Sequence, residues 1–156
     1  MPLSDDVRLG HVNLEVTNLR KARRFYDRFL SVLGFPRIPP RDPYWLGYRK
    51  GRMTIWITVS RPRRVLRKSP HVPTDGTKDP ISDHIAFAAP SAKRVAELEV
   101  ALRRKGFRPV YPTHKQRMAS GFYTSSAWSD PDNNVLELYS VTRRRRPTRD
   151  YHDGLI

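Results

Sequence analysis

The sequence predicts an α+β protein built from a βαβββ unit that occurs twice in the chain. Two short hydrophobic runs with strand periodicity each contain a histidine, His11 in the first and His84 in the second. Each run is followed by a helical pattern and then by a Gly-Phe pair, Gly34-Phe35 or Gly106-Phe107. A unit of this size cannot bury its sheet face alone. We therefore expect the two units to pack together.

The first unit, module one, is expected to span residues 8–60. After a strand over 9–16, Asn18 is a residue type that caps the start of a helix. The apolar residues of 19–33 recur at the spacing of one buried helix face, and Gly34 then fits a left-handed C-terminal cap. Three further strands are expected at 35–38, 44–48 and 53–60.

The second unit, module two, is expected to span residues 81–141. Ser91 is the expected cap of a helix over 92–105, which Gly106 ends. The run Asp130-Pro131-Asp132-Asn133-Asn134 predicts a tight turn in which Asn133 adopts a positive φ angle. The segment 106–110 echoes 34–38 of module one, and strands are expected at 82–88, 122–128 and 135–141.

Together the two modules are expected to form one domain, residues 1–141. A basic, proline-rich linker over 61–80 joins the modules, and a basic tail over 142–156 follows them. The absence of cysteine excludes disulfides and thiolate metal sites, so any metal must be held by nitrogen and oxygen. No apolar run is long enough to cross a membrane, and the N-terminus lacks a signal-peptide pattern. We expect a cytoplasmic protein.

The chain is strongly basic. Thirty Lys and Arg against fifteen Asp and Glu give a formal net charge of +15. Much of this charge lies in the segments 61–68 and 143–149. Such an excess suits an anionic substrate or non-specific binding to nucleic acid, but a solvated surface is the more ordinary explanation. Because no nucleic-acid-binding motif accompanies the charge, we do not expect nucleic acid as the main partner.

Three residues on expected strands have the chemistry of a metal site: His11, His84 and Glu137. Glu137 lies alone among apolar neighbours, and an unpaired buried carboxylate is costly, so something cationic should meet it. Two histidines and one carboxylate bind a divalent metal and leave coordination positions open. Glu15 also faces inward if His11 does, although a salt bridge at the strand end is its more ordinary role. The remaining histidines are expected in surface loops or the tail: His71, His114 and His152.

The order of elements, the duplicated strand histidines and the run Asp-Pro-Asp-Asn-Asn-Val-Leu-Glu-Leu at 130–138 resemble the vicinal oxygen chelate superfamily. Its members include glyoxalase I, fosfomycin-resistance transferases, extradiol dioxygenases and bleomycin-resistance proteins. The resemblance covers residues 8–141 and implies that the two modules form an open, cup-shaped mixed sheet with the helices outside. It further implies that His11, His84 and Glu137 are metal ligands. It also implies that the modules pair within one chain or across two chains. We expect a homodimer.

The chain departs from the glyoxalase I pattern at the fourth family ligand. Aligning 53–60 with 134–141 places Trp56 where glyoxalase I has a glutamate that serves as its acid–base group. A glyoxalase-type proton shuttle is therefore not expected. Besides Glu137, we assign a catalytic role to Tyr123, as a hydrogen-bond donor to substrate. Trp45 also suits an aromatic substrate, and the expected pocket residues are Trp56, Thr58 and Asn13.

Three functions remain open. The first is a divalent-metal-dependent enzyme, a lyase, transferase or extradiol-type dioxygenase, acting on a small oxygen-chelating substrate that is aromatic or anionic. Fe, Mn, Ni, Co and Zn all suit the ligand set. The second is a small-molecule binding protein of the bleomycin-resistance kind, without catalysis. The third is a basic, nucleic-acid-associated protein.

Overall fold

A computed structural model describes residues 9–39, 43–59, 84–119 and 121–143. The expected linker 61–80 and the tail beyond residue 143 lie outside this described part, as do His71 and His152. The predicted α+β class and both βαβββ modules are confirmed. Module one consists of β1 (His11–Val16), α1 (Leu19–Val32), β2 (Arg37–Ile38), β3 (Trp45–Lys50) and β4 (Met53–Val59). Module two consists of β5 (His84–Ala88), α2 (Ala92–Arg104), β6 (Tyr111–Met118), β7 (Gly121–Ser129) and β8 (Val135–Arg143).

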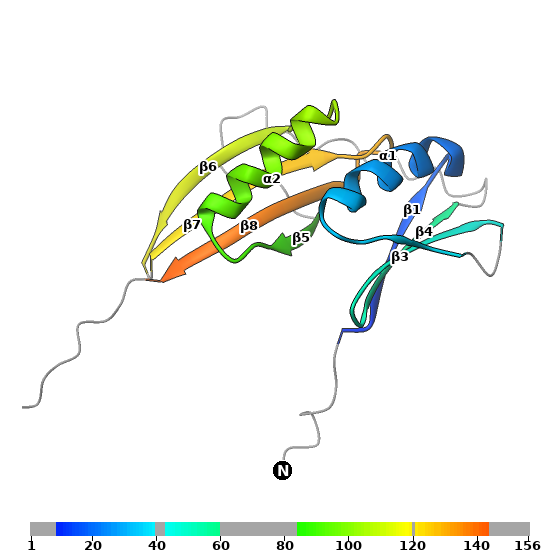
Figure 1. The fold of residues 1–156 in the computed structure, drawn as a ribbon, viewed down its shortest axis with the longest axis horizontal. Helices are drawn as coiled ribbons and strands as arrows, with labels where there is room; N and C mark the ends of the chain where they lie inside the picture. The colour runs from blue at the N-terminus through cyan, green and yellow to red at the C-terminus, as the bar shows by residue number, and fades with distance from the viewer. Residues whose placement is uncertain (1–8, 40–42, 60–83, 120, 144–156) are drawn as a thin grey trace, which may run out of the picture.

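Each module forms its own four-stranded sheet. The strand orders, β1-β4-β3-β2 and β5-β8-β7-β6, are the same topology repeated. In each sheet the first strand pairs in parallel with the last strand, and the other pairs are antiparallel. Figure 1 shows the two modules side by side. Within one chain the mixed sheet is therefore two separate sheets, and β1 and β5 are edge strands.

The helix boundaries follow the predicted capping residues. The Asn18 side chain accepts a hydrogen bond of 3.0 Å from the backbone N–H of Lys21, and Ser91 accepts one of 3.1 Å from Arg94. These bonds satisfy N–H groups that have no partner within the helix. Gly34 has a φ of 78°, the left-handed conformation expected after the end of α1.

The main difference from the sequence-based expectation is β6, an eight-residue strand that follows the predicted segment 106–110. Its sequence, Tyr-Pro-Thr-His-Lys-Gln-Arg-Met, is polar, and most of its residues are exposed. It lacks the apolar alternation that identifies a half-buried strand, because it is the outer strand of its sheet. The prediction that His114 lies in a loop is wrong, since His114 pairs with Ser125 across the sheet.

Aromatic side chains of α1 join the two modules. The ring of Phe29 packs edge-on against Trp128 of β7, with centroids 5.7 Å apart. Phe25 meets Phe107, which follows α2, at 5.1 Å. Phe29 and Trp128 are both fully buried. The helix of module one thus contributes to the core of module two, which fixes the relative position of the modules.

The turn between β7 and β8 is a second connection between the modules. The buried carboxylate of Asp130 accepts a 2.7 Å hydrogen bond from the hydroxyl of Tyr26 in α1 and two of 2.8 Å from the backbone N–H groups of Asp132 and Asn134. Burial, and then the nearby Asp130 carboxylate, raises the pKa of Tyr26 well above its usual value. The phenol is therefore a protonated donor at neutral pH.

The same turn also contacts the start of module one. Asp132 accepts a 3.0 Å hydrogen bond from the backbone N–H of Thr17, and the Asn134 side chain donates one of 3.1 Å to the carbonyl of Glu15. Asn133 has the predicted positive φ, 62°. We call Asp130 to Asn134, with these partners, the intermodule clamp. The motif predicted as a turn is therefore also a tertiary contact.

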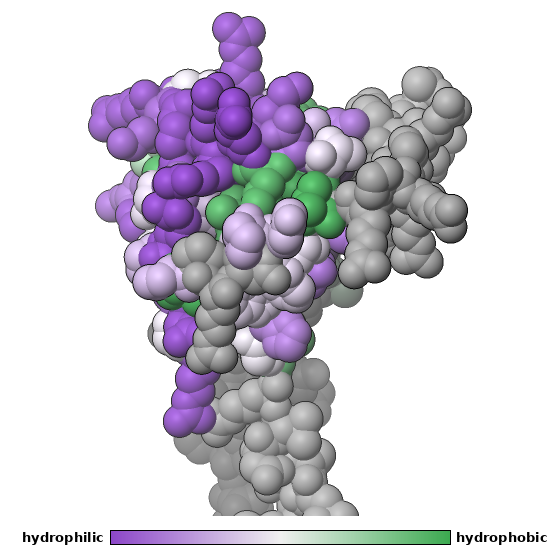
Figure 2. Space-filling model, turned by 90° about the vertical axis from the view of Figure 1, so that its right-hand side faces the viewer, coloured by the Kyte–Doolittle hydropathy of each residue, from purple (hydrophilic) through white to green (hydrophobic). Residues whose placement is uncertain are grey.

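Part of the positive charge lies on α1. Its exposed basic residues are Arg20, Lys21, Arg23, Arg24 and Arg28. Figure 2, which views the molecule from the right-hand side of Figure 1, shows hydrophilic side chains gathered over its upper part and a compact apolar area below them. An amphipathic helix with a basic outer face matches the solvated-surface interpretation of the charge. Neither described helix is long and apolar enough to cross a membrane.

Candidate functional site

The open face of module two, opposite the face covered by α2, carries two of the three expected metal ligands. Along β5 the exposed positions alternate, so His84, Ala86 and Ala88 share this face. Ala86 is the register partner of Glu137 on β8. This register brings His84 Nε2 within 3.0 Å of Glu137 Oε2. His84 and Glu137 are therefore in contact, which is one part of the expected convergence of His11, His84 and Glu137.

Glu137 is a buried carboxylate whose two oxygens both have partners. Its residue exposure is only 7%, although it lies in a strand whose neighbours are apolar. Oε2 faces His84, and Oε1 accepts a 2.9 Å hydrogen bond from the hydroxyl of Tyr123. A buried carboxylate without such partners would destabilise the folded state by several kcal/mol, because its charge would be left uncompensated. The two partners are a phenol and an imidazole, and whether a cation also meets Glu137, as the sequence argument expects, stays a prediction.

Tyr123 lies in β7, within the strand expected over 122–128. Its ring stacks on Tyr139 with centroids 5.4 Å apart and an interplanar angle of 16°. Burial, and then the hydrogen bond to Glu137, raises the pKa of Tyr123 above its usual value. The phenol is thus a protonated donor, which fixes one oxygen of Glu137 and orients the other toward His84.

The geometry of the His84–Glu137 pair fits a divalent metal. An imidazole nitrogen and a carboxylate oxygen are common ligands of Fe, Mn, Ni, Co and Zn. Ligand atoms about 2.1 Å from one ion, at right angles to each other, lie about 3.0 Å apart. The observed separation of 3.0 Å is compatible with adjacent positions around one ion, and it is also the length of a direct hydrogen bond between the two groups. Tyr123 would act there as a positioning partner that holds the carboxylate.

Module one presents the equivalent face with different chemistry. In β1 the exposed residues His11 and Asn13 share it, and Asn13 is the register partner of Trp56 on β4. The sequence alignment of Trp56 with Glu137 thus matches the register, because each lies opposite the second residue after the strand histidine. The Asn13 side chain donates a 3.2 Å hydrogen bond to Thr58. The three expected pocket residues therefore lie together.

The described residues of one chain do not complete the expected metal site. No group of three His, Asp or Glu among them could hold an ion. His84 and Glu137 form the pair, and His11 lies on the exposed face of the other module's sheet. Glu15 shares the face of His11, but no described cation forms the salt bridge expected for it.

The comparison with known protein families covers most of the chain. The model of the Glyoxalase/Bleomycin resistance protein/Dioxygenase superfamily matches residues 8–138. The chain belongs to this superfamily. A curated relative, described as "Uncharacterized protein YqjT" of Bacillus subtilis (strain 168), is 27% identical over 132 residues, which cover 83% of this chain and 96% of that protein.

Solved structures of superfamily proteins share the fold. A putative glyoxalase from Bacillus halodurans superposes with a TM-score of 0.62 at 20% identity, covering 88% of this chain and 98% of that one. A lactoylglutathione lyase from Agrobacterium tumefaciens gives 0.58 at 18% identity, covering 86% and 93%. A superfamily enzyme from Burkholderia phytofirmans PsJN gives 0.61 at 19% identity, covering 87% and 100%. Identities this low establish the architecture alone.

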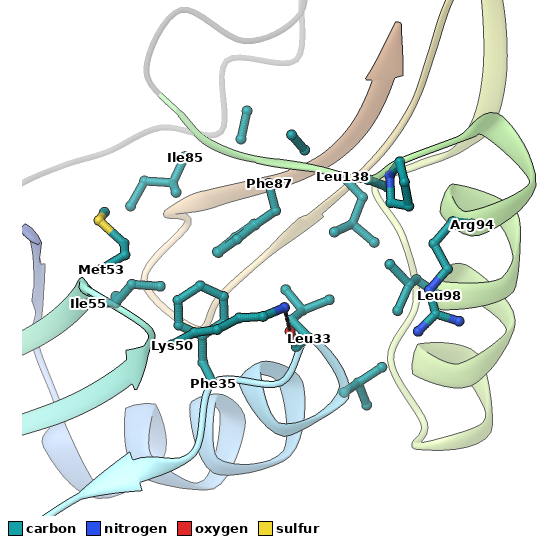
Figure 3. A pocket seen from close by; sticks show the side chains of 15 residues that line it. Leu33, Phe35, Lys50, Met53, Ile55, Ile85, Phe87, Arg94, Leu98 and Leu138 are labelled. Atoms are coloured by element: carbon teal, nitrogen blue, oxygen red, sulfur yellow. Dashed lines mark hydrogen bonds between the residues drawn. The ribbon is translucent and has the colours of Figure 1, made fainter. Parts of the chain in front are cut away.

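A groove lined mainly by apolar side chains lies beside the edge strand β5. Its volume is about 390 Å³, and Figure 3 shows the side chains that line it. Phe35 and Phe87 meet there with ring centroids 5.7 Å apart, and Lys50 donates a 2.8 Å hydrogen bond to the Leu33 carbonyl. Further apolar lining residues come from both modules: Met53, Ile55, Ile85, Leu98 and Leu138. Several of these side chains are only partly buried.

Sequence reasoning missed two features of the site. The first is the direct hydrogen bond between Tyr123 and Glu137, since the sequence assigned Tyr123 to the substrate and not to the carboxylate. The strand pairing gives only an indirect signal, because Tyr123 lies opposite Val141 and Glu137 lies four residues away along β8, on the same face. The second is Arg49, which shares the open face of module one through its register with Thr54. A single arginine among thirty basic residues gives no sequence signal.

Proposed function

We propose that this protein is a divalent-metal-dependent enzyme whose metal centre combines His84 and Glu137 of one chain with His11 of a second copy. The His84–Glu137 pair carries the proposal, because its 3.0 Å separation and its phenolic support suit an ion. A bound ion would polarise a substrate oxygen. Two protein ligands leave an ion incompletely held, and His11 is the residue that module one offers on its matching face.

A second copy is the proposed source of His11 because the single chain leaves its sheets open. Among the described strands, β1 and β5 pair along one edge only, as do β2 and β6, and free edges favour pairing with another chain. The groove beside β5 adds partly buried apolar side chains that a partner would cover (Figure 3). The intermodule clamp meanwhile holds the two modules of one chain in their present arrangement. A homodimer with an isologous interface would form two equivalent sites.

The chain's own residues have distinct roles in this proposal. Glu137 binds the ion and is held in place by Tyr123, which also remains a donor near the substrate. Asn13, Thr58 and Trp56 line the substrate side of the site. Because Trp56 replaces the carboxylate of the glyoxalase I pattern, no acidic residue stands there to move a proton. Methylglyoxal–glutathione hemithioacetal should therefore be a poor substrate, and a hydrophobic oxygen chelator a better one.

Metal analysis of protein purified without chelators tests the proposal. Wild type should retain a divalent ion, whereas Glu137→Gln and His11→Ala should each lose it. The metal-loaded protein should then be tested for O₂ consumption with catechols and for lyase or transferase activity. The oligomeric state, measured by analytical ultracentrifugation at micromolar concentration, should be a dimer. A monomer with a full complement of metal would contradict the proposed two-chain site.

A binding protein of the bleomycin-resistance kind is the second candidate. The observation that favours it is the lack of a three-ligand group among the described residues of one chain. In that case the same open faces would hold a small molecule without a catalytic ion. Tight binding of an aromatic ligand that is unaffected by Glu137→Gln, together with no retained metal, would favour this candidate over the enzyme.

A further inference from the structure

We propose that the open face of module one binds a small aryl carboxylic acid, with its ring against Trp56 and its carboxylate on Arg49. This inference rests on the proposed function, since it assumes that this face is the substrate side of the site. It adds the substrate class and a residue that determines specificity. Three observations carry it: a pair of indoles of which Trp45 is exposed and Trp56 is half-buried, an arginine without an acidic partner among the described residues, and the strand register that places them together.

The indoles of Trp45 and Trp56 form the aromatic part of this face. Their ring centroids lie 5.8 Å apart at 79°, and Trp45 is 41% exposed. Trp56 lies directly against the backbone of Gly47, where an added Cβ would come within 2.5 Å of its Cζ3 atom. The lack of a side chain at Gly47 therefore creates the space that this ring occupies. Such a surface suits contact with another aromatic ring.

Arg49 supplies the positive charge on the same face. It is exposed, and its Nε donates a 3.3 Å hydrogen bond to Thr54 Oγ1. This bond orients the guanidinium and leaves its terminal amino groups as donors. By contrast, Arg37 pairs with Asp27, and Arg103 pairs with Glu99. No described carboxylate forms an ion pair with Arg49. A guanidinium presented in this way suits a carboxylate, which it can bind through two hydrogen bonds.

The strand register places the two features beside the proposed metal ligand. His11, Thr54 and Arg49 form one row across three strands. Neighbouring strands lie about 4.8 Å apart, so His11 and Arg49 are separated by about 10 Å at the backbone. Trp56 lies in the next row of this face, about 6.6 Å along the strand. A small aryl acid can therefore contact Trp56 and Arg49 while a further oxygen substituent points toward His11.

The test uses ligands that differ in one property and is carried out on the full-length protein in EDTA. We expect 2-naphthoate to quench tryptophan fluorescence and to bind at least about tenfold more tightly than neutral 2-naphthamide, because only the acid can pair with the guanidinium. Arg49→Gln should remove this difference, and Arg49→Lys should retain part of it. Arg52→Gln, at the nearby exposed turn, is the matched control and should change nothing.

Equal binding of 2-naphthoate and 2-naphthamide to wild type would overturn the proposal, as would equal losses in Arg49→Gln and Arg52→Gln. Circular dichroism establishes that each variant is folded. The use of EDTA separates this result from the metal proposal: aryl-acid binding without retained metal in untreated protein would reject only the metal centre. Retained metal without aryl-acid binding would reject only the aryl-acid proposal.

Discussion

On the open face of module two, the carboxylate of Glu137 is buried between an imidazole and a phenol, whereas the same face of module one carries His11 and Glu15 together with two indoles, an amide and a guanidinium. The strand register shows which residues occupy equivalent positions on the two faces. Glu137 corresponds to Trp56, each opposite the second residue after a strand histidine. Tyr139 corresponds to Thr58, and Ala127 corresponds to Gly47. The two modules therefore share the strand arrangement and the strand histidine, His11 or His84, while the remaining side chains of the two faces differ.

In the proposed site, the two modules supply different parts. Module two offers the polar group that suits an ion, and its carboxylate is buried and held by Tyr123. Module one offers exposed aromatic and cationic groups that suit a substrate. The following predictions test this division, beginning with the largest expected effect.

The largest effect should come from Glu137. Glu137→Gln keeps the shape of the side chain but removes the charge, so metal affinity should fall by at least about 100-fold, the upper range for loss of a supporting residue. Trp56→Leu, at the matching position of module one, should leave metal content unchanged. Both are measured by metal analysis after equilibration with a defined ion, with Glu97→Gln on the exposed face of α2 as control. Equal metal loss in the Glu137 and Trp56 variants would remove the distinction between the faces.

The intermodule clamp should have the next largest effect, on stability. Asp130→Ala leaves several buried donors without a partner and should cost about 3 kcal/mol or more of unfolding free energy. Tyr26→Phe removes one hydrogen bond to a charged group and should cost about 1.5–3 kcal/mol. Urea denaturation measures both, and Tyr111→Phe is the control. Stability unchanged in Asp130→Ala would show that packing of α1 alone holds the modules together.

Gly47 offers a direct exchange between the modules. Gly47→Ala gives module one the residue that module two has at the matching position, but the new Cβ would meet Trp56 at 2.5 Å and Ile38 at 2.8 Å. Displacement of the indole should cost about 1–3 kcal/mol and should weaken 2-naphthoate binding. Ala127→Gly, the reverse change, should cost about 1 kcal/mol at most. Unaltered ligand binding by a folded Gly47→Ala protein would remove Trp56 from the proposed aromatic surface.

The smallest effect should be a pH-dependent contribution from Glu99 of α2. Burial raises the pKa of its carboxyl, but hydrogen bonds from Thr113 and Arg103 outweigh this and lower it below the usual value. Because the folded-state pKa is the lower one, its contribution is complete above the unfolded pKa, about 4.3, and is lost as pH falls through the folded value. The stability difference between wild type and Glu99→Gln should therefore shrink below about pH 4. A difference that is constant from pH 7 to pH 3 would contradict this assignment.

The parts of the structure that local sequence determines were predictable. Asn18 and Ser91 mark the helix starts because capping depends on the next three residues only. The approach of His84 to Glu137 followed from the repeat and the strand period. The polar strand β6 gave no such signal, because its side chains are mostly exposed on the outer edge of its sheet.

Contacts between distant segments were not predictable from sequence. The bond from Tyr26 to Asp130 joins residues in different modules, and nothing in either local pattern identifies the other. The same holds for the position of His11, since local strand periodicity places it on a face but cannot say which sheet edge, or which chain, completes the site. The arrangement of the two modules was therefore the limit of the sequence-based prediction.

The most direct test of the proposed two-chain centre is complementation between His11→Ala and His84→Ala chains. Each variant alone should retain no metal, because every site would lack one histidine. In a purified heterodimer carrying two different affinity tags, the intact His11 of one chain would join the intact His84 and Glu137 of its partner. We expect one metal ion per heterodimer, with activity restored in proportion. A heterodimer without metal, formed from chains that dimerise normally, would contradict the account.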